Sequence, residues 1–273
     1  MTENQPSHPA ELDWLTAVAI AAIAISLNVA FHEGVHAATC LLVGGDLLEF
    51  SALHVDCRAT ADWQSRVVAG SASIANLLLG TLIWRLLSRL RNRVDTSRLF
   101  FLWLFMLMNW LYGAGYWMLS GAANLGDWAV VIAGWEPHLL WRGLLFVAGA
   151  LLFVYFVWLA LHELGQFLGG SAPEQLSRAA KLGILTYITS ALVILAAGWF
   201  NPYGILGLPS VAGAAAVLGA LSPLLWMMQW LKARSFPKPA GPPLTIPRSW
   251  SLVGLGGLAV ILYAVVLGRT LYF

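Results

Sequence analysis

The apolar residues of this chain come in seven long runs that are separated by short polar segments. The runs cover approximately residues 14–43, 67–87, 99–119, 139–161, 182–200, 211–231 and 252–272. An α-helix needs roughly 20 apolar residues to cross the hydrocarbon core of a bilayer, and each run has about that length or more. The pattern predicts an all-α, multi-pass membrane protein with about seven transmembrane helices.

Charged residues are scarce in this sequence. Asp, Glu, Lys and Arg make up 10% of the 273 residues, whereas hydrophobic residues make up 59%. Soluble globular domains carry about 25% charged residues. The composition therefore excludes a soluble enzyme, a disordered chain and a disulfide scaffold. A net charge of +2 without a basic face also argues against a nucleic-acid partner, and the expected environment is the lipid bilayer.

The basic residues are concentrated in two connections between the apolar runs. Segment 85–98 holds five arginines and one aspartate, and segment 232–248 holds four basic residues and no acid. With seven spans, both connections lie on the side of the N-terminus. Because cytoplasmic loops are enriched in Lys and Arg, we expect a cytoplasmic N-terminus. Segment 235–250 contains five prolines and is typical of a semi-rigid linker.

The main candidate for chemistry is an HExxH motif in the second half of the first run, formed by His32, Glu33 and His36. On a helix, residues four apart project from one face, so both imidazoles can bind one Zn²⁺. Glu33 lies beside that face, where its carboxylate can take a proton from water at the metal's open position. Three ionisable residues deep in a span indicate a functional site.

A catalytic zinc ion normally has three protein ligands, so the motif needs one more residue. Asp127 is the first candidate because small and apolar residues surround it. Its alternative interpretation is the N-cap of a short helix that begins there. The other candidate ligands are Asp46, His54, Asp56, Glu136 and His138.

Two further residues on the motif's helix are polar. Asn28 lies one turn before His32 and is a candidate to orient a histidine. Cys40 lies one turn after His36, where packing is the more usual role and zinc ligation the alternative. His162 and Glu163 form a second His-Glu pair, but Gln166 stands where a second histidine would be needed. We expect a polar cluster at the end of a span there rather than another metal site.

These motifs resemble the site-2 protease family of intramembrane zinc metalloproteases. The resemblance covers roughly residues 14–134 and rests on an HExxH in the first core span, Asn76 in the second, and an acid after the third. It implies that His32, His36 and Asp127 bind one zinc ion and that Glu33 is the catalytic base. The family's Gly-Pro is replaced by Ala72-Ser73, and Asp127 lacks the Gly that usually follows.

The resemblance also implies a division of the chain. Residues 1–136 would form the protease-like core, and about four accessory helices would follow in residues 137–273. Segment 44–65 would be a hairpin that helps to hold an extended substrate, and Asn76 would lie near that substrate or behind the metal ligands. The family places its zinc near the cytosolic face, whereas the charges described above place this site on the opposite side.

The expected function is therefore cleavage of a peptide bond in or near a transmembrane segment of a membrane-protein substrate. An accessory membrane protein is a candidate partner. The alternative is a non-proteolytic membrane metal-binding protein, either chaperone-like or a metal carrier.

Overall fold

The computed structural model describes residues 12–168, 172–227 and 244–273. Seven helices in these ranges are long and apolar enough to cross a membrane, which confirms the predicted number of spans. The main helices are α1 (Trp14–Leu42), α2 (Asp62–Leu90), α3 (Thr96–Ala123), α5 (His138–Gly165), α6 (Ala172–Phe200), α7 (Leu208–Leu221) and α9 (Trp250–Val260). The short helix α8 (Pro223–Trp226) extends the sixth span, and a π-turn over Ile261–Val266 with a 3₁₀ turn over Leu267–Arg269 extends the seventh.

The boundaries differ from the apolar runs by a few residues at several helix ends, and two differences stand out. Helix α6 begins at Ala172, about three turns before the predicted residue 182, because a helix can continue through polar residues beyond the hydrocarbon region. The last predicted run ends early, since Leu271–Tyr272 forms strand β3 instead of helix. The predicted end of the sixth run at residue 231 and most of the proline-rich linker lie outside the described residues.

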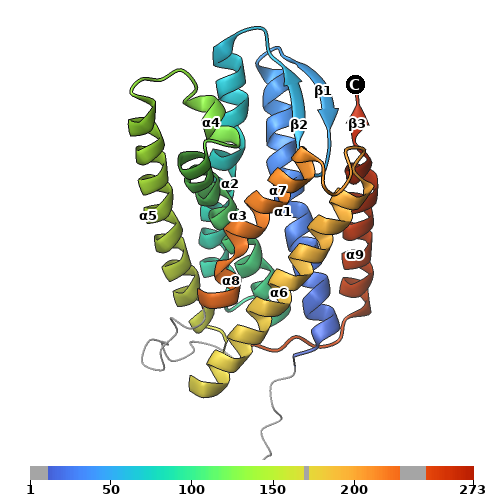
Figure 1. Ribbon diagram of the computed structural model, residues 1–273. Helices are drawn as coiled ribbons and strands as arrows, with labels where there is room; N and C mark the ends of the chain where they lie inside the picture. Colours follow the sequence, from blue (N-terminus) through green and yellow to red (C-terminus); the bar gives the residue numbers. More distant parts are fainter. Residues whose placement is uncertain (1–11, 169–171, 228–243) are drawn as a thin grey trace, which may run out of the picture.

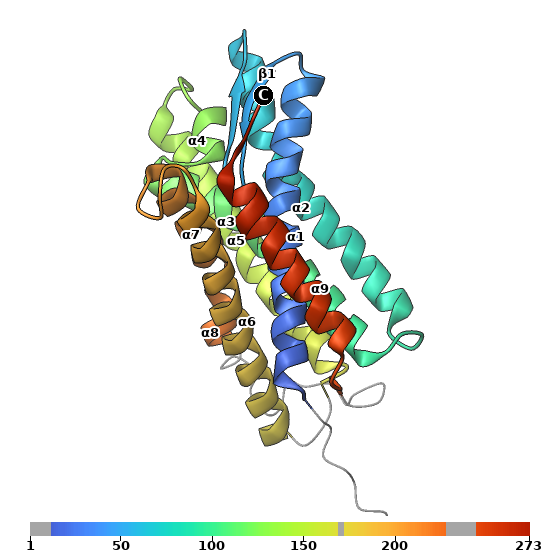
Figure 2. The same ribbon diagram turned by 90° about the vertical axis from the view of Figure 1, so that its right-hand side faces the viewer.

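The helices form an elongated bundle around α3, which packs against α2 and α5 (Figure 1). Helix α1 packs against α2, α6 and α9, as the rotated view in Figure 2 also shows. Residues from the expected core region, 1–136, and from the expected accessory region, 137–273, contribute to one continuous apolar core. Large apolar side chains on the outer face of α5, including Leu139, Leu151 and Trp158, are exposed, as expected of a surface that faces lipid.

Small residues bring α3 close to its neighbours. A Cβ at Gly113 would lie 2.8 Å from the carbonyl oxygen of Ser73 in α2. A Cβ at Gly149 in α5 would lie 2.8 Å from the backbone nitrogen of Met118. Close backbone approach through small residues is a common means of packing helices in membranes. It fixes α2 and α3 side by side, and both helices contribute to the site described below.

A small antiparallel sheet covers one end of the bundle. Strand β1 (Asp46–Phe50) pairs with β2 (Val55–Arg58) inside the expected hairpin segment, and β3 pairs with the other edge of β1. The strand order is β2-β1-β3, so the outer edge of β2 has no strand partner in the part of the chain that the structure describes. The hairpin lies at the same end of the bundle as the short helix α4 (Asp127–Val131) (Figure 1).

A disulfide bond joins the hairpin to the first helix. Cys40, near the end of α1, is bonded to Cys57 in β2. The prediction that Cys40 acts mainly in packing was wrong, because the chain reverses after α1 and brings β2 back alongside it. A Cβ at Gly45 would lie 2.9 Å from the sulfur of Cys57, so the turn passes close to the bridge.

Candidate metal centre

Helix α1 and the short helix α4 bring three potential metal ligands together. The Nε2 atoms of His32 and His36 lie 3.2 Å apart on one face of α1, and both side chains are buried. The Oδ2 atom of Asp127 lies 3.2 Å from the first of these nitrogens and 3.3 Å from the second. The structure therefore gathers these three sequence-predicted residues into a group that could hold a metal ion.

Hydrogen bonds on the far side of each ring determine which nitrogen faces the cluster. His36 Nδ1 donates to the carbonyl oxygen of Val68 at 2.8 Å, and His32 Nδ1 lies 2.7 Å from Asn76 Oδ1. A ring whose Nδ1 carries the hydrogen presents an unprotonated Nε2, which is the form that binds metals. The two α2 contacts therefore leave both Nε2 atoms facing the cluster in the form that can ligate a metal.

The contact from Asn76 continues through a second asparagine. Asn76 Nδ2 donates to Asn109 Oδ1 at 2.8 Å, and Asn109 Nδ2 donates to the carbonyl oxygen of Phe105 at 2.7 Å. Because a backbone carbonyl can only accept, it fixes the orientation of Asn109, then of Asn76, and finally the tautomer of His32. Asn109 was not singled out from the sequence, although a lone Asn inside an apolar span is a signal for such a role.

The cluster combines three acceptors and needs a cation. With both Nδ1 atoms protonated, two nitrogen lone pairs and one carboxylate converge, and Asp127 Oδ2 has no hydrogen-bond donor among the described residues. A proton on a histidine or a shared metal ion can satisfy them. A tetrahedral zinc ion with bonds of about 2.0–2.1 Å separates its ligand atoms by about 3.3 Å. The observed separations of 3.2, 3.2 and 3.3 Å match that spacing.

Asp127 is held by contacts between α4 and the second span. The Arg66 guanidinium in α2 donates to the carbonyl oxygens of Val131, the last residue of α4, and of Ala133, which follows the helix. Trp128 Nε1 donates to Ser73 Oγ at 2.6 Å. Ser73 in α2 thus supports the residue next to Asp127.

The alternative role of Asp127 as a helix cap was wrong. The cap of α4 is Gly126 with φ +80, and Asp127 is the first helical residue with its carboxylate directed at the histidines. Burial raises the pKa of this carboxyl, but when a proton on His36 completes the cluster, its charge and the contacts with both histidines outweigh burial. They hold the pKa of Asp127 well below its usual range, so the carboxylate is ionised at neutral pH.

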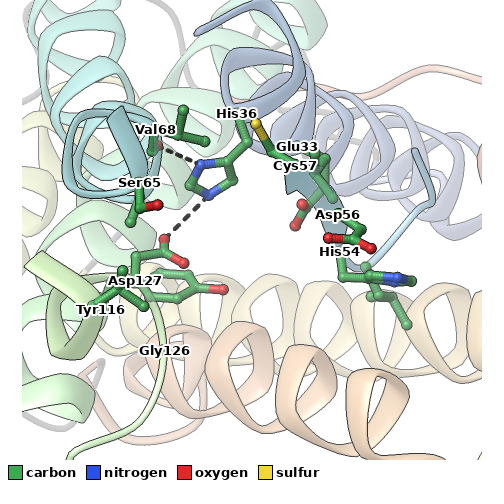
Figure 3. A pocket seen from close by; sticks show the side chains of 14 residues that line it. Glu33, His36, His54, Asp56, Cys57, Ser65, Val68, Tyr116, Gly126 and Asp127 are labelled. Atoms are coloured by element: carbon green, nitrogen blue, oxygen red, sulfur yellow. Dashed lines mark hydrogen bonds and ion pairs between the residues drawn. The ribbon is translucent and has the colours of Figure 1, made fainter. Parts of the chain in front are cut away.

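An open cavity of about 460 Å³ leads to the cluster. Figure 3 shows Glu33 on one side of it, with its carboxylate directed into the space beside His36 and Asp127. The hairpin lies on the same side as Glu33, and five of its consecutive residues line the cavity: Leu53, His54, Val55, Asp56 and Cys57. The remaining lining residues are Ser65, Val68, Ala69, Tyr116, Gly126 and Val130. A molecule in this cavity would contact the hairpin, Glu33 and the metal ligands together.

The other candidate ligands lie outside the cluster. His54 and Asp56 line the cavity, but His54 Nε2 pairs with Glu49 at 3.0 Å. His138 Nε2 lies 3.1 Å from Asn124 Oδ1, away from the motif. Asp46 and Glu136 are not part of the three-residue group either. Asn28 is buried, and its amide has no hydrogen-bond partner in residues 12–168, 172–227 and 244–273, so Asn76 rather than Asn28 contacts His32.

In the part of the chain that the structure describes, fold and site together define a helical protein with seven potential membrane spans and a His-His-Asp cluster that opens to a cavity beside a glutamate. No protein-family model, curated protein or solved structure matches this chain. The functional argument therefore depends on the residues themselves.

Proposed function

We propose that this protein is a membrane-embedded zinc metallopeptidase, a divergent relative of the site-2 proteases, that cleaves a membrane-protein substrate in or near a transmembrane segment. The observation that carries the proposal is the convergence of three acceptor atoms at separations of 3.2–3.3 Å, with Glu33 in the same cavity. Such a set suits an ion with three protein ligands and an open position, as in catalytic zinc sites.

In the proposed reaction, His32, His36 and Asp127 hold the ion. A zinc ion held by these residues would supply Lewis-acid chemistry, polarising the scissile carbonyl and lowering the pKa of water. Glu33 accepts a proton from the attacking water and delivers it to the leaving amine as the C–N bond breaks. Glu33 is 3% exposed, so a bound substrate would exclude bulk water from this transfer.

The hairpin supports an extended substrate. An α-helix hides its carbonyl groups in hydrogen bonds, so a transmembrane segment must unwind before a peptide bond can be attacked. The outer edge of β2 has no strand partner among the described residues, and the hairpin lines the cavity over five consecutive residues. An unwound segment could add to this edge as a further strand.

We also propose that the N-terminus is cytoplasmic and that the cavity opens on the opposite side. The arginine-rich connection between α2 and α3 lies at the end of the bundle away from the hairpin (Figure 2). The Cys40–Cys57 disulfide lies at the hairpin end, and disulfides persist in oxidising, non-cytoplasmic compartments. Both arguments agree, and they oppose the orientation that the family resemblance implies.

The orientation can be tested in intact cells with a membrane-impermeant phosphine followed by a maleimide of high mass. We expect Cys40 and Cys57 to become reactive without permeabilisation. A cysteine placed by Asn92→Cys, in the connection between α2 and α3, should react only after permeabilisation. The reverse pattern would overturn the orientation while leaving the metal site untouched.

The function is tested by measuring zinc and cleavage in the same variants. Purified protein should hold about one zinc ion per chain, and the double variant His32→Ala/His36→Ala should hold none. His54→Ala, a histidine in the same cavity, is the matched control and should keep the metal. Full zinc content in the double variant would exclude the site.

Glu33→Gln separates metal binding from catalysis, because the amide cannot accept the proton of water. This variant should keep zinc. Membrane proteins that are cleaved in cells with the unaltered protein should accumulate uncleaved in cells with the variant. If no membrane protein is processed by the unaltered, zinc-loaded protein, the non-proteolytic metal-binding alternative is correct.

A further inference from the structure

Tyr116 occupies a place in the cavity that the proposed mechanism does not use. It belongs to α3, its side chain is 8% exposed, and it lines the same cavity as Glu33, His36 and Asp127. In Figure 3, the ring lies beneath Asp127, the hydroxyl extends into the cavity, and Glu33 enters from the other side. The hydroxyl and the carboxylate thus approach the space next to the metal ligands from two directions.

The hydrogen of this hydroxyl is available to a bound molecule. The hydrogen-bond partner that the structure gives it is the hydroxyl of Tyr112, at 3.4 Å. Hydrogen bonds between hydroxyl groups are usually near 2.7–2.8 Å, so this contact is weak. Tyr112 is buried and does not line the cavity. It can donate to Tyr116, which leaves the hydrogen of Tyr116 for the cavity.

The ring of Tyr116 is held in a fixed position. It stacks on the imidazole of His32 with ring centroids 4.8 Å apart and an interplanar angle of 17°. On another side, a Cβ at Gly126 would lie 3.3 Å from the ring, so the loop before Asp127 packs against it. A donor held in advance beside the reacting atoms costs little reorganisation when charge develops there.

We propose that Tyr116 is a further catalytic residue, whose hydroxyl donates a hydrogen bond to the carbonyl oxygen of the scissile peptide bond. This inference rests on the proposed peptidase function. The bond strengthens as that oxygen gains negative charge during attack by water. Tyr116 keeps its hydrogen throughout, because the proton of the water passes to Glu33 and then to the leaving amine.

The test compares Tyr116→Phe with the unaltered protein, both loaded with zinc in detergent. The probe is a short apolar peptide in which a phosphinic group replaces one peptide bond and imitates the tetrahedral, negatively charged state. We expect Tyr116→Phe to keep about one zinc ion per chain and to bind the probe at least tenfold more weakly. Binding of the same peptide with an ordinary amide should change less than threefold. On a cleavable substrate, kcat should fall by about 10²–10³ with a smaller change in KM, as for loss of one oxyanion donor.

Tyr112→Phe is the matched control, since it removes a hydroxyl from the same helix and the same group of rings without changing the cavity lining. It should bind the probe within about threefold of the unaltered protein. If Tyr116→Phe binds zinc and the probe normally, Tyr116 has a packing role only and the inference is wrong. If the unaltered zinc protein does not bind the probe at all, the proposed peptidase function fails as well.

Discussion

Helices α1 and α5 each carry a His-Glu pair. Hydrogen-bond acceptors surround the pair in α1, whereas hydrogen-bond donors contact the pair in α5. In α1, His32 is joined by His36 and Asp127, so acceptor atoms face one another at 3.2–3.3 Å. In α5, His162 Nε2 accepts from Gln166 Nε2 at 2.9 Å. Glu163 there receives hydrogen bonds from Trp84 Nε1 at 2.9 Å and from the Arg91 guanidinium.

The comparison shows how neighbouring elements decide what a short motif does. Around Glu163, a guanidinium and an indole supply the hydrogens that the carboxylate needs, so the group is complete without an ion. In His32 and His36, the Nδ1–H groups donate to α2 on the side away from the cluster. On the side of the cluster, the Nε2 atoms and the Asp127 carboxylate are all acceptors. A metal ion would complete the α1 group, whereas Arg91 would repel a cation from the α5 group.

The largest effect, a loss of stability, should come from breaking the ion pair between Glu163 in α5 and Arg91. Glu163→Gln leaves the Arg91 guanidinium, whose side chain is 16% exposed, without its carboxylate. Removing one partner of a largely buried ion pair costs about 3 kcal/mol, so the protein should unfold at a clearly lower temperature in detergent. Zinc content should stay the same.

The control for this variant is Asp95→Asn, which removes the exposed pair with Arg98 and keeps a side chain able to cap α3. It should change stability by less than about 0.5 kcal/mol. Equal unfolding temperatures for the two variants would show that the buried pair contributes no more than an exposed one.

The next effect concerns the carboxylate of the α1 group. Asp127→Asn replaces a charged oxygen by a neutral amide, a poor ligand for a divalent cation, and should weaken zinc binding by about tenfold or more. Competition with a chelator measures the affinity. Asp56→Asn changes an acid in the same cavity outside the cluster and should leave it unaltered. Unchanged affinity in Asp127→Asn would remove this residue from the ligand set.

A smaller effect on zinc affinity is expected from the hydrogen-bond relay behind His32, which runs through Asn76 to Asn109. Asn109→Leu removes the group that orients Asn76, and loss of such outer contacts commonly costs about tenfold in metal affinity. Asn28→Leu is the matched control, because it also replaces a buried asparagine but one without a hydrogen-bond partner among the described residues. If Asn28→Leu weakens zinc binding more than Asn109→Leu, the relay assignment is wrong.

The smallest effect on zinc content is expected from completing an HExxH motif at His162 and Glu163 in α5. Gln166→His gives α5 an HExxH pattern, yet Arg91 remains beside Glu163 and α5 lacks a carboxylate placed like Asp127 among the described residues. Elemental analysis should still find about one zinc ion per chain. A second zinc ion would mean that the helical motif alone is sufficient.

Much of the helical architecture could be predicted from the sequence, because long apolar runs have few alternatives in a bilayer. The convergence of His32 and His36 also follows from helical spacing. Asp127 was a candidate because of the small and apolar residues around it and because of the family resemblance, and not from periodicity, since its position depends on how α4 folds back after α3. Contacts of Arg66 and Trp128 with other elements determine that fold.

The rest depends on which helix faces are in contact, and one sequence does not specify that. Asn28 shares a face with His32, but the Nδ1 atom of the ring points to α2, where it is hydrogen-bonded to Asn76. The Cys40–Cys57 bridge requires the hairpin to return to α1, and two cysteines alone did not indicate this. Tyr116 is one of many aromatic residues in the spans, and only the cavity distinguishes it from a packing residue.

The placement of Asp127 on a five-residue helix has a consequence for the rate of metal exchange. The two histidines belong to a 29-residue helix inside the bundle, whereas Asp127 is attached through the contacts of Arg66 and Trp128 with α4 and its flanks. Opening of that short segment needs few contacts to break, whereas moving α1 would disrupt the core. We therefore expect the lifetime of a bound ion to follow local opening of α4, and a chelator to remove it without unfolding the protein.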